Sequence, residues 1–156
     1  MGLFHAPFLP PDGLVMALDP NNTKSYSGTG LTVLDMSGSN NNGVLTNGPT
    51  YSNGYISLDG SNDVITIANS TSSSLTDNFT VCMWARIKNA AISVPLGKYV
   101  GGSRGWVFIY DRYTAYFGGR NQTADGYKEI GAIGTSVSTN IWYFWTGVKT
   151  GTSMSV

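Results

Sequence analysis

Charged residues, cysteine and histidine are scarce in this chain of 156 residues. Lys, Arg, Asp and Glu together make up 12 %, about half the share of an average globular protein, and the formal net charge is zero. No basic stripe is present that could neutralise a row of phosphates, so we do not expect nucleic acid as a partner. The polar surface consists of hydroxyl and amide groups, which suits neutral ligands such as sugars, or tight association with other proteins.

The single cysteine, Cys82, excludes an internal disulfide, and with the single histidine, His5, it also excludes a transition-metal cluster. Because Cys82 lies inside an apolar run, we expect it to be a buried, small hydrophobic residue. No stretch approaches the ~20 apolar residues of a membrane span. The N-terminal segment lacks a basic region and is broken by prolines, so we expect no signal peptide and synthesis in the cytoplasm.

Glycine, serine, threonine and asparagine are abundant instead, and they separate many short apolar runs. No apolar pattern of helical period lasts more than one turn. The best strand covers 79–88, where both faces are apolar at the centre, so we expect it inside a layered structure. Trp84, Phe108 and Trp142 are predicted core residues.

The spacing of these runs predicts an all-β sandwich or barrel. Hairpins are predicted at "GSN" (60–62), at "DR" (111–112) and at "KTG" (149–151). The predicted strands cover residues 14–18, 31–35, 55–59, 63–68, 79–88, 93–100, 105–111, 113–119, 128–134, 141–149 and 152–156.

Residues 1–12 are predicted to form an extended N-terminal arm. Phe4, Phe8 and Leu9 lie among prolines, which favours an extended segment with few hydrogen bonds that lies on an apolar surface. The arm packs either on its own domain or on a neighbouring subunit, and the sequence leaves both possibilities open.

An ordered series of motifs resembles one known family. The motifs are "DGLVMALD" (12–19), "LDMSGSNNNGVLTNGP" (34–49), "LDGSND" (58–63), "FTVCMW" (79–84) and "IWYFWTGVK" (141–149). The chain is similar to the laminin-G-like, concanavalin A-like lectin and glucanase sandwiches, in the version common in bacteriophage structural proteins and bacterial surface proteins. The resemblance implies a two-sheet antiparallel jelly roll over residues 13–156.

Family members continue for several strands beyond the position of Val156. The resemblance therefore implies that the jelly roll is incomplete at its C-terminus and presents an open sheet edge. Either the chain is part of a longer product, or a partner supplies the missing strands.

Carboxyl groups in catalytic spacing are not expected. Hydrolases of the family use closely spaced acidic residues, and retaining or inverting glycosidases need two carboxyl groups at a defined separation. This chain has one glutamate, Glu129, and no Glu-x-Asp-x-Glu pattern. Asp59 and Asp63 flank a predicted turn, and His5 lies in the arm, so we predict that the protein is not an enzyme.

Calcium is the one cofactor that the sequence suggests, because oxygen-bearing side chains gather in two loops of the resemblance. The candidate ligands are Asp35, Asn40, Asp59 and Asp63. The alternative, which we favour, is structural: Asp35 caps its own turn and the loop turns the chain at the rim of the sandwich.

A recognition surface is predicted in the second half of the chain, where aromatic, amide and charged residues alternate. Tyr113 at a hairpin corner and Tyr127 after a polar loop are expected to be exposed. The predicted surface consists of Arg112, Tyr113, Asn121, Asp125 and Tyr127.

The resemblance, together with the expected lack of a signal peptide and of catalytic carboxyl groups, implies a non-catalytic virion surface protein, such as a capsid decoration or a head- or tail-fibre component, made in the host cytoplasm. Its expected partners are other virion subunits, in a homo-oligomer or with capsid or tail proteins, and host glycans. The alternatives are a carbohydrate-binding adhesion domain of a bacterial cell surface and, third, a polysaccharide hydrolase.

Overall fold

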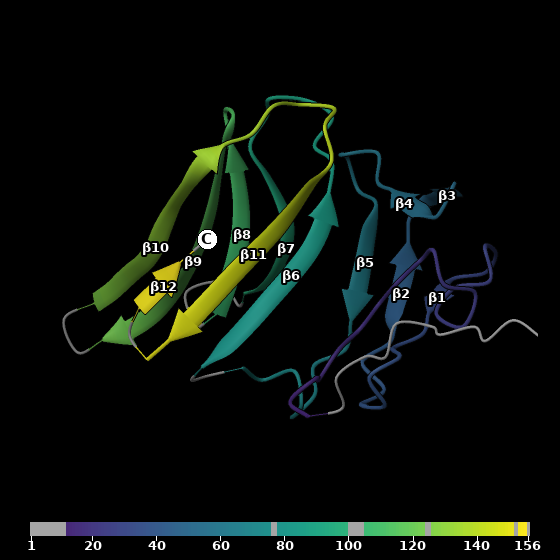
Figure 1. Cartoon of the computed structure of the whole chain (residues 1–156), viewed down its shortest axis with the longest axis horizontal. Helices are drawn as coiled ribbons and strands as arrows, with labels where there is room; N and C mark the ends of the chain where they lie inside the picture. Colours follow the sequence, from purple (N-terminus) through teal and green to yellow (C-terminus); the bar gives the residue numbers. More distant parts are fainter. Residues whose placement is uncertain (1–11, 76–77, 100–104, 124–125, 152, 156) are drawn as a thin grey trace, which may run out of the picture. The chain divides into compact units, whose positions relative to one another are not determined.

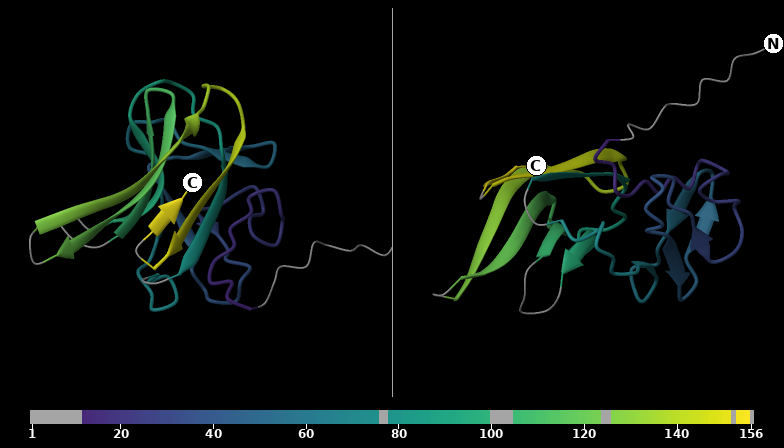
Figure 2. Two further views of the ribbon diagram at one scale, coloured as in Figure 1. Left: turned by 60° about the vertical axis from the view of Figure 1, so that its left-hand side comes forward. Right: turned by 90° about the horizontal axis from the view of Figure 1, so that it is seen from below.

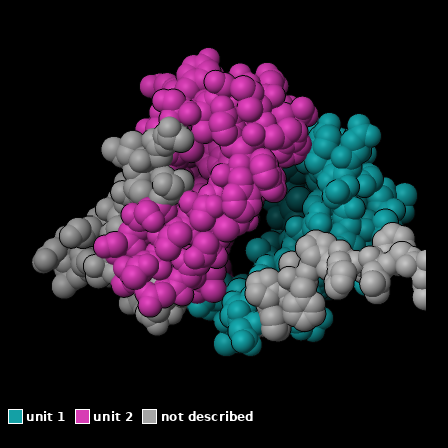
Figure 3. Space-filling model, viewed as in Figure 1, with its two compact units in different colours: residues 1–74 teal, residues 75–156 magenta. Residues whose placement is uncertain are grey.

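The computed structural model describes residues 12–75, 78–99, 105–123, 126–151 and 153–155. Within these ranges the chain forms β-strands and no helix, so the described residues include no helix that could span a membrane. The chain divides into two compact units, residues 1–74 and 75–156 (Figure 3), and each is described by itself. The predicted arm residues Phe4, Phe8 and Leu9 lie outside the described residues.

Five short strands form the first unit (Figure 1). Strands β1, β2 and β5 make one antiparallel sheet in the order β1-β2-β5, and β3 and β4 make a separate hairpin. The bounds are β1 Thr32–Val33, β2 Gly43–Thr46, β3 Thr50–Ser52, β4 Tyr55–Ser57 and β5 Val64–Ile67.

The core of the first unit is small. Among the described residues of this unit, the buried apolar ones are Tyr26, Val33 and Leu45, and three partly buried residues pack against them: Leu18, Ile56 and Ile65. The Tyr26 hydroxyl donates a hydrogen bond of 2.9 Å to the carbonyl of Gly30, which satisfies the polar end of this buried ring.

Two predictions for this unit are wrong. Residues 14–18 form no strand, and the turn at 60–62 does not close a hairpin, because β4 pairs with β3 and β5 pairs with β2. The β3–β4 hairpin instead closes at Asn53–Gly54, where both residues have positive φ. An Asn-Gly pair is the favoured sequence for such a two-residue turn.

Two antiparallel sheets form the second unit (Figure 1). One contains four strands in the order β10-β9-β8-β7, and the other contains three in the order β12-β11-β6. The bounds are β6 Phe79–Ala85, β7 Ser93–Tyr99, β8 Gly105–Asp111, β9 Thr114–Thr123, β10 Gly126–Ser136, β11 Tyr143–Thr150 and β12 Ser153–Ser155.

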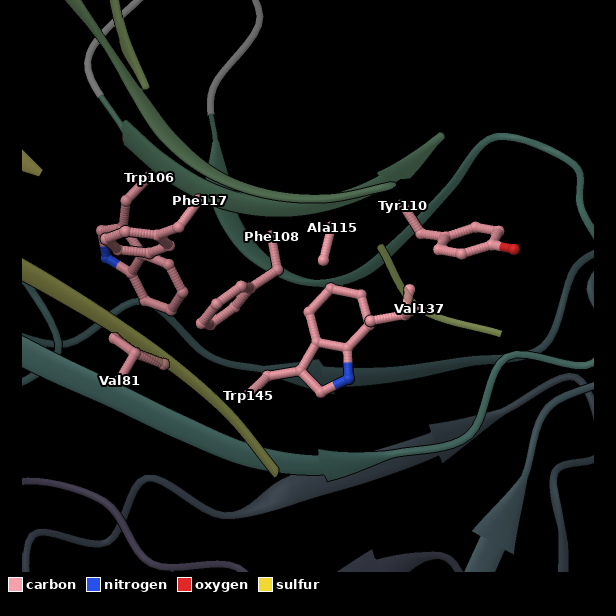
Figure 4. Close-up of a cluster of buried hydrophobic side chains, with 8 residues drawn as sticks. All are labelled: Val81, Trp106, Phe108, Tyr110, Ala115, Phe117, Val137 and Trp145. Carbon is pink, nitrogen blue, oxygen red and sulfur yellow. The ribbon is translucent and has the colours of Figure 1, made fainter. Parts of the chain in front are cut away.

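These two sheets form two layers (Figure 2) with one aromatic core between them (Figure 4). On β8, every second residue from Trp106 to Tyr110 is buried, as the period of a strand requires. Phe108 pairs with Phe117 of β9, and their ring centroids are 4.8 Å apart. Trp145 of the facing sheet meets Phe108 edge to face at 5.9 Å. The all-β class and antiparallel sheets are confirmed, and this unit is sandwich-like.

Hairpins of the second unit fall close to their predicted places. The predicted β11–β12 hairpin forms, but its turn comes later than 149–151: Lys149 and Thr150 are still paired with β12, and Gly151, at positive φ, lies between Thr150 and its partner Ser153. The β8–β9 turn is one residue later than predicted, at Arg112 and Tyr113, because Asp111 and Thr114 are the last paired residues.

Candidate functional site

Asp35, predicted either as a calcium ligand or as a turn residue, has both carboxylate oxygens occupied by hydrogen bonds. Its Oδ1 accepts from the backbone N–H groups of Ala17 at 2.8 Å and Ser37 at 2.9 Å. Its Oδ2 accepts from the Ser37 hydroxyl at 2.8 Å and from the N–H of Asn41 at 2.9 Å. Asp35 therefore joins the segment around Ala17 to its own loop.

These bonds change the acidity of the group. Partial burial raises the pKa of Asp35, but the amides of Ser37, Ala17 and Asn41 and the Ser37 hydroxyl together outweigh it, so the pKa lies below its ordinary value. The charged form of Asp35 is thus part of the folded structure. A calcium ion here would have to displace these donors, so this carboxylate does not fit a metal site.

Asn41, which the sequence did not single out, is the buried centre of the same loop, whereas its predicted neighbour Asn40 is exposed at positive φ. The Asn41 amide donates to the carbonyl of Val15 at 2.6 Å and to the Ser72 hydroxyl at 3.0 Å. Its oxygen accepts from the Ser70 hydroxyl at 2.5 Å. No pattern in the run of three asparagines at 40–42 distinguishes the buried one.

Asp59 and Asp63, the other two predicted calcium ligands, lie together in one exposed turn. Asp59 Oδ1 accepts from the N–H groups of Ser61, Asn62 and Asp63, and Asp63 Oδ2 accepts from the N–H of Asp59 at 3.0 Å. The hydrogen bond from Ser61 is the main cause that lowers the pKa of Asp59. In the described part of the chain, no three acidic, histidine or cysteine side chains gather in a metal-binding group. Calcium at this turn stays a prediction.

Arg112 and Tyr113, from the predicted recognition surface, form the exposed tip of the β8–β9 hairpin. Their φ angles are 45° and 74°, a conformation that favours glycine and asparagine over bulky residues. The backbone carbonyl of Tyr113 accepts from the N–H of Val137 at 2.8 Å, which holds the turn in place. The tip therefore presents a guanidinium group and a phenol ring from a fixed backbone.

The other predicted members of this surface lie elsewhere. Asn121 belongs to β9 and pairs with Lys128, Tyr127 belongs to β10 and pairs with Gln122, and Asp125 lies outside the described residues. Tyr113 lies in the turn just before β9 and Asn121 near the far end of that strand, and a spacing of eight positions along a strand is roughly 26 Å. The strand geometry therefore separates Arg112 and Tyr113 from Asn121 and Tyr127.

An exposed set of aromatic side chains, which the sequence placed in the core, lies on the outer side of β6 and β11. Trp84 is 66 % exposed, Phe144 is 55 % and Trp142 is 40 %, so the prediction that both tryptophans are buried is wrong. Phe108, predicted with them, is fully buried as expected. We call Trp84, Phe144 and Trp142, with the adjoining Arg86, the aromatic face.

The strand pairing explains this exposure. Trp84 and Phe144 are direct partners on β6 and β11, and their neighbours Met83 and Trp145 point into the core instead. The two outer rings have centroids 5.3 Å apart and are tilted by 48°. The Arg86 guanidinium carbon lies 5.3 Å from the centre of the Trp142 ring, a cation–π distance.

Cys82 lies on the same outer side, and the prediction of a buried cysteine is wrong. It pairs with Thr146 across the two strands, and its Sγ lies 3.7 Å from the Thr146 hydroxyl oxygen. Because strand side chains alternate between faces, a residue next to Val81 and Met83 of the core must point away from it.

Comparison of the chain with models of known families, with curated proteins and with solved structures finds no match.

Proposed function

We propose that this chain is a non-catalytic surface protein of a virion, a capsid decoration or fibre component with a concanavalin A-like jelly roll, that contacts host glycans. The observation that carries the recognition role is the aromatic face. Three large rings in water on one side of a well-packed sheet form a patch of the kind that marks an interaction site.

The acidic side chains support a role without catalysis. The carboxylates of Asp35 and Asp59 accept hydrogen bonds from the loops that contain them. Groups used in this way hold the backbone, and a general acid or base would need to exchange protons with a substrate instead. The viral part of the proposal rests on the resemblance to phage structural proteins.

A location experiment tests the proposal. Particles released from the source culture are purified, and the chain is sought in them by intact-mass measurement and by immunogold labelling with an antiserum raised against it. We expect a regular number of copies on the particle surface. Labelling of the bacterial envelope without labelling of particles would replace the proposal with a cell-surface adhesion domain, which could use the same aromatic face.

The hydrolase alternative has its own assay. Purified protein is incubated with neutral polysaccharides, and the release of new reducing ends is measured. We expect none above the rate of the heat-treated protein, and a protein-dependent release would contradict the proposal.

A further inference from the structure

We infer that the aromatic face is the binding site of a neutral glycan, which stacks on Trp84 and Phe144 and runs along the outer side of β11 and β12. This inference rests on the proposed function, because it names the ligand and the site of that recognition.

The composition of the outer side matches the two kinds of surface of a sugar. Pairing with β6 and β12 places the side chains of Thr80, Thr146 and Val148 on the same side as the rings, with hydroxyls continuing along the sheet to Thr150, Ser153 and Ser155. The aromatic rings lie at one end and the hydroxyls at the other. A sugar ring has an apolar C–H face that stacks on an aromatic ring and hydroxyl groups that bond to such hydroxyls.

The charge of the surface also favours a neutral ligand. The outward-facing residues of β6, β11 and β12, all in the described part of the chain, are uncharged: Thr80, Cys82, Trp84, Phe144, Thr146, Val148, Thr150, Ser153 and Ser155. Arg86, just beyond β6, lies against the Trp142 ring. A charged partner would find little here to complement it.

The size of the patch argues against a second copy of the chain as its occupant. The three rings expose roughly 350 Å² in total, if a whole aromatic side chain has 150–250 Å². A stable protein interface buries about 800 Å² on each partner. The exposed ring area alone is therefore less than half of what one partner of a stable dimer buries, so a dimer would have to bury other surface as well, whereas a few sugar units would cover the rings.

Binding of neutral hexasaccharides tests the inference. Cellohexaose, maltohexaose and mannohexaose are titrated against the chain by calorimetry, with a heparin hexasaccharide as the anionic comparison. We expect at least one neutral sugar to bind more tightly than the anionic one. Trp84→Ala and Phe144→Ala are each expected to weaken this binding by about tenfold or more, the effect of removing a central aromatic contact.

Matched controls make the result specific. Val94→Ala removes an exposed apolar residue from another strand, β7, and should bind as the wild type does. Tyr113→Ala removes the aromatic ring of the hairpin tip and tests whether the sugar binds there instead. Circular dichroism checks that each variant is folded, which we expect because these side chains are exposed. If all three neutral sugars fail to bind, the inference is wrong.

Other outcomes separate the inference from the proposed function. Sugar binding that survives in the Trp84→Ala/Phe144→Ala double variant, or is lost in Tyr113→Ala alone, overturns the site and leaves the function standing. A wild-type dimer that becomes monomeric in Trp84→Ala shows that a second copy occupies the face and also overturns the inference. If the chain binds sugar at the aromatic face but is absent from particles, the inference about the binding site stands and the proposed virion role is wrong.

Discussion

At the scale of single residues, the first unit depends on two polar side chains in one loop. Asp35 binds the backbone at Ala17, and Asn41 binds the backbone at Val15 and the Ser72 hydroxyl. Strand pairing alone does not fix these segments, because residues 14–18 form no strand. A buried polar group that is fully bonded costs little, but it costs the full desolvation energy when one partner is removed. The loop is thus held by hydrogen bonds in a unit whose apolar core is small.

Replacement of Asp35 tests this role. Asp35→Asn removes a charged acceptor of four hydrogen bonds, and we expect it to lower the free energy of unfolding at pH 7 by about 2 kcal/mol. The measurement is urea unfolding followed by far-UV circular dichroism. Asp59→Asn is the matched control, because Asp59 has a similar arrangement in an exposed turn, and we expect a smaller loss.

We also expect the difference in stability between the wild type and Asp35→Asn to depend on pH. The pKa of Asp35 is lower in the folded state than the ordinary value of 3.8, so its stabilisation is complete above that value and is lost as pH falls through the folded pKa. The difference in stability between wild type and Asp35→Asn should therefore shrink below about pH 4. A constant difference from pH 7 down to pH 2 would contradict the assignment.

At the scale of elements, the β8–β9 hairpin uses residues that its turn does not favour. Arg112 and Tyr113 both adopt positive φ, where Asn-Gly is the preferred pair. The ion pair from Arg112 to Asp111, at 3.8 Å, is largely exposed and contributes little. Backbone strain of this kind is often found at functional sites, and the exposed hairpin tip is therefore a second candidate for contact with a ligand or partner.

Substitution of this turn should stabilise the protein. We expect Arg112→Asn with Tyr113→Gly to raise the free energy of unfolding by about 2 kcal/mol, because left-handed backbone is unfavourable for bulky residues. Thermal unfolding followed by tryptophan fluorescence measures the change. A lower melting temperature would show that the Arg112 and Tyr113 side chains stabilise the hairpin by more than their backbone strain costs.

Gly147 of β11 lies directly against the Phe117 ring of the facing sheet. A Cβ atom there would lie 2.5 Å from the ring of Phe117, which is fully buried. We expect Gly147→Ala to destabilise the unit by about 1–3 kcal/mol, the usual range for overpacking a core. Chemical unfolding followed by tryptophan fluorescence measures it.

A double variant provides the control for this contact. Phe117→Leu removes the ring, so the cost of Gly147→Ala should be smaller in that background than in the wild type. Equal costs in both backgrounds would mean that the ring is not the obstacle.

Strand positions in the second unit were predictable, whereas the exposure of their outer faces was not. The alternation in 79–88 correctly identified β6 and its inward residues Val81 and Met83. The same pattern predicted that Cys82 and Trp84 are buried, because a strand with apolar residues on both faces is usually packed against other elements on both faces. Period two separates the faces of a strand, but it does not say what lies over each face.

The candidate site shows the same limit. Asp35 could be recognised as a turn-capping residue from its place before Ser37 and Gly38, and the structure agrees. Its link to Ala17, and the burial of Asn41 rather than its neighbours, depend on contacts between segments distant in sequence. The pairing of Trp84 with Phe144 likewise joins positions sixty residues apart, and one sequence carries no signal for it.

At the scale of the whole molecule, the two units differ in the size of their apolar cores and in their content of tryptophan, the fluorescent residue that reports on unfolding. Among the residues whose burial the structure describes, the first unit has three buried apolar residues and the second has eight, rich in aromatic rings. All four tryptophans, Trp84, Trp106, Trp142 and Trp145, belong to the second unit. Tryptophan fluorescence therefore follows that unit alone, while far-UV circular dichroism follows both.

Thermal unfolding can use this asymmetry. We expect the circular dichroism signal to begin changing at a lower temperature than tryptophan fluorescence, because the smaller core stabilises its unit less. Hydrogen exchange with mass spectrometry of peptides from 12–74 and 78–151 provides an independent check. Coincident transitions in both probes would show that the two units unfold as one cooperative structure.

The position of the single thiol has a practical consequence for how this protein is handled. Cys82 is exposed and lies two residues along β6 from Trp84, on the same outer side of the sheet as Trp84 and Phe144. A maleimide dye attached there, with no engineering of the sequence, would sense the arrival of a molecule on the rings through its emission. The same chemistry used to couple the protein to a chip would instead mask the rings, so attachment through a lysine would be the sounder choice.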